Sequence, residues 1–119
     1  MTRNLRRGDV VYVGVPTTDA TEVRRRPALV VQDAALSTAF PNVIVAGITS
    51  RIERRGPGRI FVRAQSPEGR EMGLLRDSLV TLDNLATVGR WMITEIRGTC
   101  PIIAEVDEAL RTVLGLHRP

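Results

Sequence analysis

The segment "VRRRPALVVQ" (residues 23–32) places three consecutive arginines directly before a proline and an unbroken apolar run. The run over residues 28–32 is too short for an independent helix and too apolar for a surface loop, so it predicts a buried β-strand. A proline holds the residue before it in extended geometry, and Arg26 is therefore expected at the edge of this strand. Arg24 and Arg25 are expected farther out, on a polar loop that ends at Arg26.

The arginine triplet has two interpretations. The three charges can be solvated residues that flank an aggregation-prone strand, or they can relieve their mutual repulsion by binding an anion. The chain has a formal net charge of +4, and all 17 of its basic residues are arginines. Arginine stays protonated and offers phosphate a planar fork of donors. The composition therefore suits nucleic acid as a partner, beside the alternative of an ordinary solvated basic surface.

Further strands are predicted on both sides of this segment. Residues 9–15 are rich in β-branched side chains, and residues 42–48 form the expected partner of the strand at 28–32. Residues 58–64 alternate apolar with polar positions, and residues 77–82 add another short strand. Five or so strands at this spacing predict a mainly β fold with some α structure, built as a small barrel.

The end of the chain changes to helical periodicity. Thr99 is the expected N-cap, Pro101 suits the first turn, and Gly115 offers a C-terminal cap. The apolar positions between them form one stripe, which predicts an amphipathic helix packed against the sheet. The stripe consists of Ile102, Ile103, Val106, Leu110, Val113 and Leu114.

Length and composition exclude several classes of protein. A chain of 119 residues is expected to form one domain over residues 1–119. A single cysteine, Cys100, cannot form an intramolecular disulfide, which suits a reducing compartment. The N-terminus lacks the apolar core of a secretory signal, and no apolar stretch approaches the ~20 residues of a membrane span. A cytoplasmic protein without membrane association is therefore expected.

Polar side chains also follow the predicted strand at 42–48. Thr49, Ser50 and Arg51 come directly after it, so two hydroxyls and a cation emerge together. If this strand and the one after Arg26 are neighbours, Arg26 and Thr49 can meet. The alternative is ordinary loop chemistry, because Ser and Thr often end strands by bonding to nearby backbone.

The residue inventory argues against several known nuclease mechanisms. One histidine, His117, cannot supply the pair that a two-histidine ribonuclease needs. The chain has no Cys/His cluster for zinc, and its acidic residues are too scattered to predict a metal-assisted nuclease. No metal and no cofactor are expected. Cys100 is interpreted as structural, because nothing suggests a histidine partner for it.

Five segments in the same order resemble the MazF/PemK family of toxin endoribonucleases, the mRNA interferases of toxin–antitoxin modules. They are "RRGDVVYV", "RRRPALVVQ", "VIVAGITSR", "GLLRDSLVTLDNLATV" and "AEVDEALRTVLGL", which together cover nearly the whole chain. The resemblance implies an SH3-like barrel of the PemK/CcdB type with a C-terminal helix. It also implies a homodimer, metal-independent cleavage of single-stranded RNA at a short sequence, and a cognate MazE-like antitoxin that occludes the site.

The resemblance also implies roles for particular residues. The family's arginine before the strand proline falls on Arg26, and its threonine falls on Thr49; both are expected to be catalytic. RNA binding is expected at Arg24, Arg25, Ser50, Arg51 and Glu22. The chain departs from the family at "TEVRR" (residues 21–25), where many relatives have Glu-Gln-x-Gly, so that Glu22 lies one position from the family's glutamate. Gly47 stands where relatives often have proline.

Cleavage of this kind is attack by the ribose 2′-OH on the adjacent phosphate, leaving 2′,3′-cyclic phosphate and 5′-OH ends. Negative charge grows on the phosphorane, which an arginine can stabilise. We therefore expect Arg26 to act electrostatically and Thr49 to hydrogen-bond the scissile phosphate, with no base assigned. Two alternatives are a non-catalytic toxin like CcdB, which binds a protein, and an RNA-binding barrel without catalysis.

Overall fold

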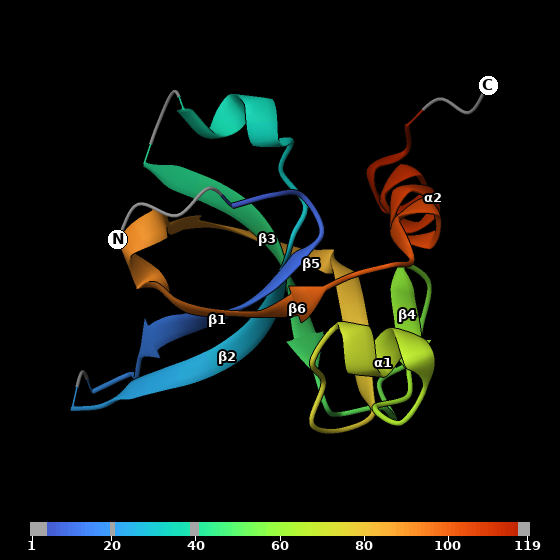
Figure 1. The fold of residues 1–119 in the computed structure, drawn as a ribbon, viewed down its shortest axis with the longest axis horizontal. Coiled ribbons are helices and arrows are strands. Elements are labelled where there is room, and N and C mark those ends of the chain that lie inside the picture. The colour runs from blue at the N-terminus through green and yellow to red at the C-terminus, as the bar shows by residue number, and fades with distance from the viewer. Residues whose placement is uncertain (1–4, 20, 39–40, 117–119) are drawn as a thin grey trace.

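Six β-strands form one antiparallel sheet in the computed structural model, which describes residues 5–19, 21–38 and 41–116 (Figure 1). The strand order is β4-β5-β3-β2-β1-β6. The strands are β1 (Asp9–Pro16), β2 (Val23–Val30), β3 (Asn42–Thr49), β4 (Arg59–Val62), β5 (Ser78–Gly89) and β6 (Ile93–Thr99). The helical segments are η1 (Ala34–Thr38), α1 (Pro67–Glu71), η2 (Arg90–Met92) and α2 (Ile103–Leu114).

Six strands and a C-terminal helix confirm the prediction of a mainly β fold with some α structure. The sheet is strongly bent (Figure 1). Strands β4 and β6 are the two edges, so within the described residues the barrel is open rather than closed by pairing. The register shifts between Val10 and Val11 in β1 and between Ala46 and Gly47 in β3. Such bulges add an unpaired residue and increase the local twist, which helps the sheet to curl.

Apolar residues are buried on both faces of the sheet. One core contains Val10, Leu29 and Ala46 and is covered by α2. The other contains Val11 and Ala28 from the same strands. The β1–β2 register pairs Val10 with Leu29 and Val11 with Ala28, so successive residues enter opposite cores. This two-sided burial explains why the strand sequences are nearly continuous apolar runs.

Strand β2 begins earlier than the sequence pattern predicts. It starts at Val23, and its register with β1 pairs Arg24 with Val15 and Arg26 with Val13. The prediction that a loop runs to Arg26 is therefore wrong. Pairing with β1 satisfies the backbone groups on one side of this segment, while the long arginine side chains remain in solvent.

The two halves of β2 differ in their neighbours. Its pairing with β3 begins at Ala28, which is opposite Gly47. Its first half therefore pairs on one side only, and Pro27 stands where two-sided pairing stops. Proline has no N–H to donate, so a position at such an edge suits it.

Helix α2 begins later than expected. Thr99 ends β6, and Pro101 lies before the helix, whose N-cap is Ile102 without a side-chain capping bond. The N-cap and first-turn predictions are therefore wrong, because pairing with β1 extends β6 to Thr99. The C-terminal cap is confirmed: Gly115 adopts a left-handed conformation with φ 65°.

The predicted apolar stripe of α2 does face the sheet, with one exception. Val106 is fully buried, and Ile102, Ile103, Leu110 and Val113 pack against the same core. Leu114 is 52% exposed, so the stripe ends one residue earlier than predicted. None of the helices in the described part of the chain is long and apolar enough to cross a membrane.

The loop after α1 approaches β6 closely at Gly73. Its φ is 71°, and a Cβ atom there would lie 2.7 Å from the carbonyl oxygen of Arg97. Glycine is required because it tolerates both the left-handed backbone and the short approach. The loop is thereby held beside the strand that carries Arg97.

Candidate active site

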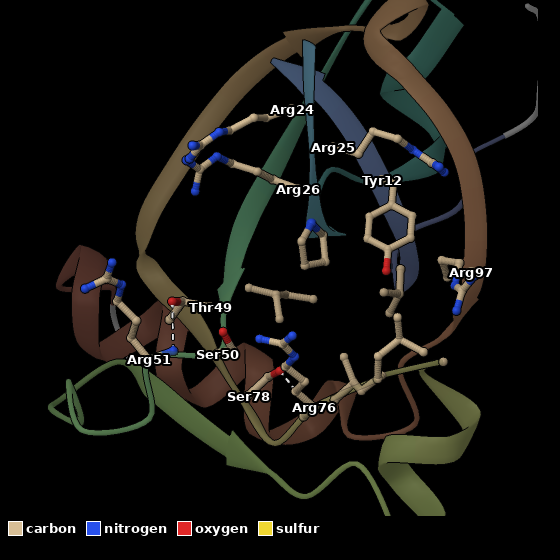
Figure 2. A pocket seen from close by; sticks show the side chains of 16 residues that line it. Tyr12, Arg24, Arg25, Arg26, Thr49, Ser50, Arg51, Arg76, Ser78 and Arg97 are labelled. Atoms are coloured by element: carbon tan, nitrogen blue, oxygen red, sulfur yellow. Dashed lines mark hydrogen bonds between the residues drawn. The ribbon is translucent and has the colours of Figure 1, made fainter. Parts of the chain in front are cut away.

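A cavity of about 510 Å³ opens beside the first half of β2 and the end of β3 (Figure 2). Strand β1, the loop before β5 and strand β6 complete its walls. In the part of the chain that the structure describes, six of the lining residues are arginines and none is a carboxylate. The arginines are Arg24, Arg25, Arg26, Arg51, Arg76 and Arg97.

All but one of the predicted site residues line this cavity. Arg24, Arg25, Arg26, Thr49, Ser50 and Arg51 are among its lining residues. Glu22 is not; it lies in the turn between β1 and β2, where its carbonyl accepts a hydrogen bond of 2.9 Å from Thr17 N–H. The backbone of Glu22 therefore closes a turn, and its carboxylate is exposed.

Arg26 and Thr49 lie on two strands that separate at this cavity. The last residue pair between β2 and β3 is Ala28 with Gly47. Continuing that antiparallel register by two residues would place Arg26 opposite Thr49. Because pairing stops before them, their side chains line an opening instead of a continuous sheet.

The arginine triplet is divided between two sides of β2. Arg24 and Arg26 point the same way, toward Thr49 and Arg51, whereas Arg25 points toward Tyr12 (Figure 2). Successive side chains of a strand alternate between its faces, and this alternation separates the like charges. The consequence is two groups of cations on different walls of one cavity.

The Thr49 hydroxyl is oriented by local backbone. Its Oγ accepts a hydrogen bond of 3.1 Å from Arg51 N–H. That bond uses a lone pair of the oxygen, so the hydroxyl proton can be donated to a ligand oxygen. The alternative considered from the sequence, a local bond between the Thr49 side chain and the backbone, is therefore also present. This bond leaves the hydroxyl proton available to a ligand.

Several cations of the cavity have no carboxylate partner within the described residues. The ion pairs found anywhere in the described residues are Arg7–Asp107, Arg25–Glu95, Arg59–Asp83, Arg97–Glu95 and Arg111–Glu108. They leave Arg24, Arg26, Arg51 and Arg76 without a counter-charge from that part of the chain. A hollow lined by one sign of charge concentrates field and attracts an anionic ligand.

Other groups considered from the sequence are poorly placed for catalysis. Cys100 is buried at the end of β6, and burial raises the pKa of its thiol, which lowers its reactivity. His117 lies outside the described residues. The described part of the chain contains no group of three or more His, Cys, Asp or Glu side chains arranged to hold a metal ion.

The family of the chain follows from a match over almost its whole length. Residues 6–114 match the model of the PemK-like, MazF-like toxins of type II toxin–antitoxin systems. The chain belongs to this family. The resemblance seen in the five sequence segments is confirmed.

Relatives of this PemK-like, MazF-like toxin agree with the match. Endoribonuclease EndoA of Bacillus subtilis is 28% identical over 116 residues, which are 94% of this chain and 96% of that protein. The fold is similar to that of an endoribonuclease in complex with its cognate antitoxin from Mycobacterial species (TM-score 0.74, 21% identity, 97% and 99% of the two chains). It is also similar to MazE-MazF from Deinococcus radiodurans (TM-score 0.75, 22% identity, 98% and 100%).

Four polar lining residues of this MazF-like toxin were not singled out from the sequence as site residues. They are Tyr12, Arg76, Ser78 and Arg97. Tyr12 was assigned only to a strand, and Arg97 lies in β6, which the sequence pattern did not predict. Alternation along residues 93–99, with Ile93 and Ile96 among polar residues, is too weak a signal to identify that strand.

A second hollow of about 380 Å³ adjoins the first and shares Arg26, Thr49 and Arg51 with it. Its remaining lining includes apolar residues such as Val13 and Val45, together with Arg54 and Arg59. Arg26 therefore stands between a cation-rich cavity and a more apolar one. A ligand longer than one nucleotide, or a peptide with acidic and apolar residues, could contact both.

Proposed function

We propose that this toxin is an endoribonuclease that cleaves single-stranded RNA at a short sequence without a metal ion. The observation that carries the proposal is the cavity that Arg26 and Thr49 line from separate strands, together with further arginines and, among the described residues, no carboxylate. Phosphodiesters are the ligands that such a lining favours. The endoribonuclease names of the Bacillus and mycobacterial relatives support the same activity.

The proposed reaction is an attack within the RNA strand. The 2′-oxygen forms a bond to the adjacent phosphorus, and the bond from phosphorus to the 5′-oxygen breaks. The products are a 2′,3′-cyclic phosphate and a 5′-hydroxyl, so the leaving oxygen gains one proton and the 2′-oxygen loses one. Among the described residues none that lines the cavity is a carboxylate or a histidine, and we therefore assign no side chain as the base.

Arg26 and Thr49 would act on the phosphate during this attack. The Arg26 guanidinium stabilises the negative charge that grows on the non-bridging oxygens, and the Thr49 hydroxyl donates a hydrogen bond to one of them. Arg24, Arg51 and Ser50 lie near them and would hold the flanking backbone. Such contacts to phosphate position the strand and carry no sequence information.

The test of this function is cleavage of single-stranded RNA by the purified protein in EDTA. We expect discrete fragments whose ends are 2′,3′-cyclic phosphates and 5′-hydroxyls. An Arg26→Ala protein purified in the same way controls for a contaminating ribonuclease. Bound but intact RNA would instead indicate an RNA-binding barrel, and absence of both binding and cleavage would indicate a CcdB-like toxin.

We propose further that the toxin is a cytoplasmic homodimer that a MazE-like antitoxin inhibits. A small domain gains stability by burying apolar surface against a copy of itself, and two-fold symmetry is the commonest arrangement. The cation-rich cavity and the apolar hollow beside it would attract an acidic segment with apolar residues. The named complexes of MazF-type relatives with antitoxin support this partner.

If the antitoxin covers this cavity, it should compete with RNA. We expect sedimentation of the free toxin to give the mass of a dimer, and RNA cleavage to fall to background when its antitoxin is added in excess. RNA in large excess should reduce antitoxin binding in return, since the coupling between two ligands is reciprocal. A monomer that remains fully active in saturating antitoxin would contradict the proposal.

A further inference from the structure

Glu95 joins two of the arginines that line the cavity. Its carboxylate forms an ion pair with Arg25 of β2 and a second one, of 3.2 Å, with Arg97 of β6. Glu95 itself lies in β6, so its side chain reaches past β1 to Arg25 on β2.

Both arginines of this cluster pack over the ring of Tyr12. The guanidinium carbon of Arg25 lies 5.0 Å from the ring centroid, and that of Arg97 lies 5.4 Å from it. Both distances are within the range of cation–π attraction. Tyr12 is paired with Glu95 in the β1–β6 register, so all four side chains gather at one place.

This cluster lies on the wall opposite the proposed reaction centre. Tyr12, Arg25 and Arg97 are seen together on one side of the cavity, and Arg24, Arg26 and Arg51 with Thr49 on the other (Figure 2). Single-stranded RNA carries one phosphate per nucleotide, so a strand that crosses the cavity brings more than one phosphate to it. The two groups of cations can therefore contact different phosphates of one strand.

The Glu95 carboxylate resembles a bound phosphate in charge and in hydrogen bonding. Two planar guanidinium groups around one oxyanion are a common arrangement for phosphate recognition. Hydrogen bonds from Arg97 and Arg25 lower the pKa of Glu95, so its carboxylate stays charged further into the acidic range. Glu95 does not line the cavity itself, but its carboxylate pairs with two of the arginines that do.

A purely structural role explains this carboxylate poorly. The side chains of Arg25, Glu95 and Arg97 are 51%, 36% and 31% exposed. Ion pairs with that much solvent contact contribute little to stability, because water and salt screen them. Strand β6 is also held independently by its backbone pairing with β1.

We propose that Arg25 and Arg97, held against Tyr12, bind a second phosphate of the RNA, and that Glu95 occupies their guanidinium groups when RNA is absent. The proposal rests on the proposed function, since it concerns the same cavity and the same substrate. Glu95 then competes with RNA for the guanidinium groups of Arg25 and Arg97 and weakens RNA binding. Removing the negative charge of Glu95 should therefore strengthen binding, the opposite of what loss of an ordinary contact does.

The test is the affinity of a Glu95→Gln protein for an RNA with a 2′-O-methyl group at the scissile position. We expect binding about 2- to 5-fold tighter at low salt, the range that corresponds to exposed ion pairs. The plot of log affinity against log salt should also steepen by about 0.7, the value for one further neutralised phosphate on a single strand. Glu108→Gln is the matched control, because it removes one carboxylate from α2, away from the cavity.

Variants of the arginines should act in the other direction. Arg97→Ala should weaken binding and flatten the salt plot by about 0.7, as should Arg24→Ala on the other wall. In the Arg97→Ala background, Glu95→Gln should have less effect than in the parent, since Glu95 acts through that arginine. In the Arg24→Ala background, Glu95→Gln should strengthen RNA binding as much as it does in the parent.

Two outcomes would overturn the proposal. One is a Glu95→Gln protein that binds RNA with the affinity and salt dependence of the Glu108→Gln control. The other is weaker binding together with a lower melting temperature, which would show that Glu95 mainly supports the fold.

Failure of this inference can be told apart from failure of the proposed function. If the parent protein cuts RNA and Arg26→Ala does not, but Glu95→Gln behaves like its control, the second phosphate site alone is wrong. If the parent binds RNA without cutting it, the proposed reaction is wrong, and the Glu95→Gln measurement still tests the phosphate site.

Discussion

Replacing Arg26 with alanine should lower the rate of RNA cleavage by about 100-fold or more, the usual cost of deleting a group that stabilises charge in a transition state. Arg26 lies between the two hollows and has no carboxylate partner within the described residues. Its guanidinium is thus available to the phosphorane. Single-turnover cleavage of a defined RNA measures the effect on the chemical step directly.

Two further variants sharpen this result. Arg26→Lys keeps the charge but loses the planar fork of donors, so it should restore only part of the rate. Arg111→Ala removes an equal charge from α2, where it pairs with Glu108 and does not line the cavity, and should cleave at the parental rate. An Arg26→Ala protein that folds normally and cuts RNA as fast as the parent would show that the assigned centre is wrong.

Thr49→Val tests the other strand of the same centre. Valine keeps the shape of threonine but has no hydroxyl, so both the donated bond to phosphate and the accepted bond from Arg51 N–H are lost. We expect a loss of kcat with little change in RNA affinity. An unchanged kcat would contradict a catalytic role for Thr49 and would show that its hydroxyl serves only in the local bond to backbone.

Leu29→Ala should destabilise the protein by about 2–5 kcal/mol, the range for truncating a large buried side chain. Leu29 is 0% exposed and lies in the core beneath α2, where β2 is paired with both β1 and β3. Surrounding strands restrict its neighbours, so the cavity left by the truncation should collapse poorly. Urea unfolding at one protein concentration measures the change in free energy.

An exposed leucine provides the control for that measurement. Leu36 of η1 is 65% exposed, and Leu36→Ala should change stability by no more than about 0.5 kcal/mol. Similar losses in the two variants would mean that Leu29 does not occupy the core as described. Because Leu29 is three residues from Arg26, its loss should also reduce cleavage through disorder of β2.

Much of the fold could be predicted because its local patterns are strong. The β-branched run at 9–15 and the apolar run at 42–48 became β1 and β3 with nearly the same bounds. The helical stripe and Gly115 predicted the position and end of α2. In the candidate site, the proline after Arg26 and the hydroxyls of Thr49 and Ser50 at the end of β3 marked side chains that do line one cavity.

The weaker strands depend on partners distant in the sequence, so local patterns could not reveal them. The first half of β2 is a row of arginines that becomes a strand because β1 pairs with it. Strand β6 mixes polar and apolar residues, and its pairing with β1 includes a register shift beside Arg97. In both segments, long-range backbone hydrogen bonds outweigh the local preference of the side chains.

The chain's arginine content, its apolar runs and its helical stripe follow from the order of residues alone, and so does the placement of Thr49 at a strand end, whereas Arg26 lies within β2. The division of the arginine triplet does not. It requires the β1–β2 register, because strand alternation sends Arg24 and Arg26 to one wall and Arg25 to the other. The meeting of Arg25 with Tyr12, Glu95 and Arg97 requires β1 to lie between β2 and β6, and that order comes from backbone pairing between segments distant in the sequence.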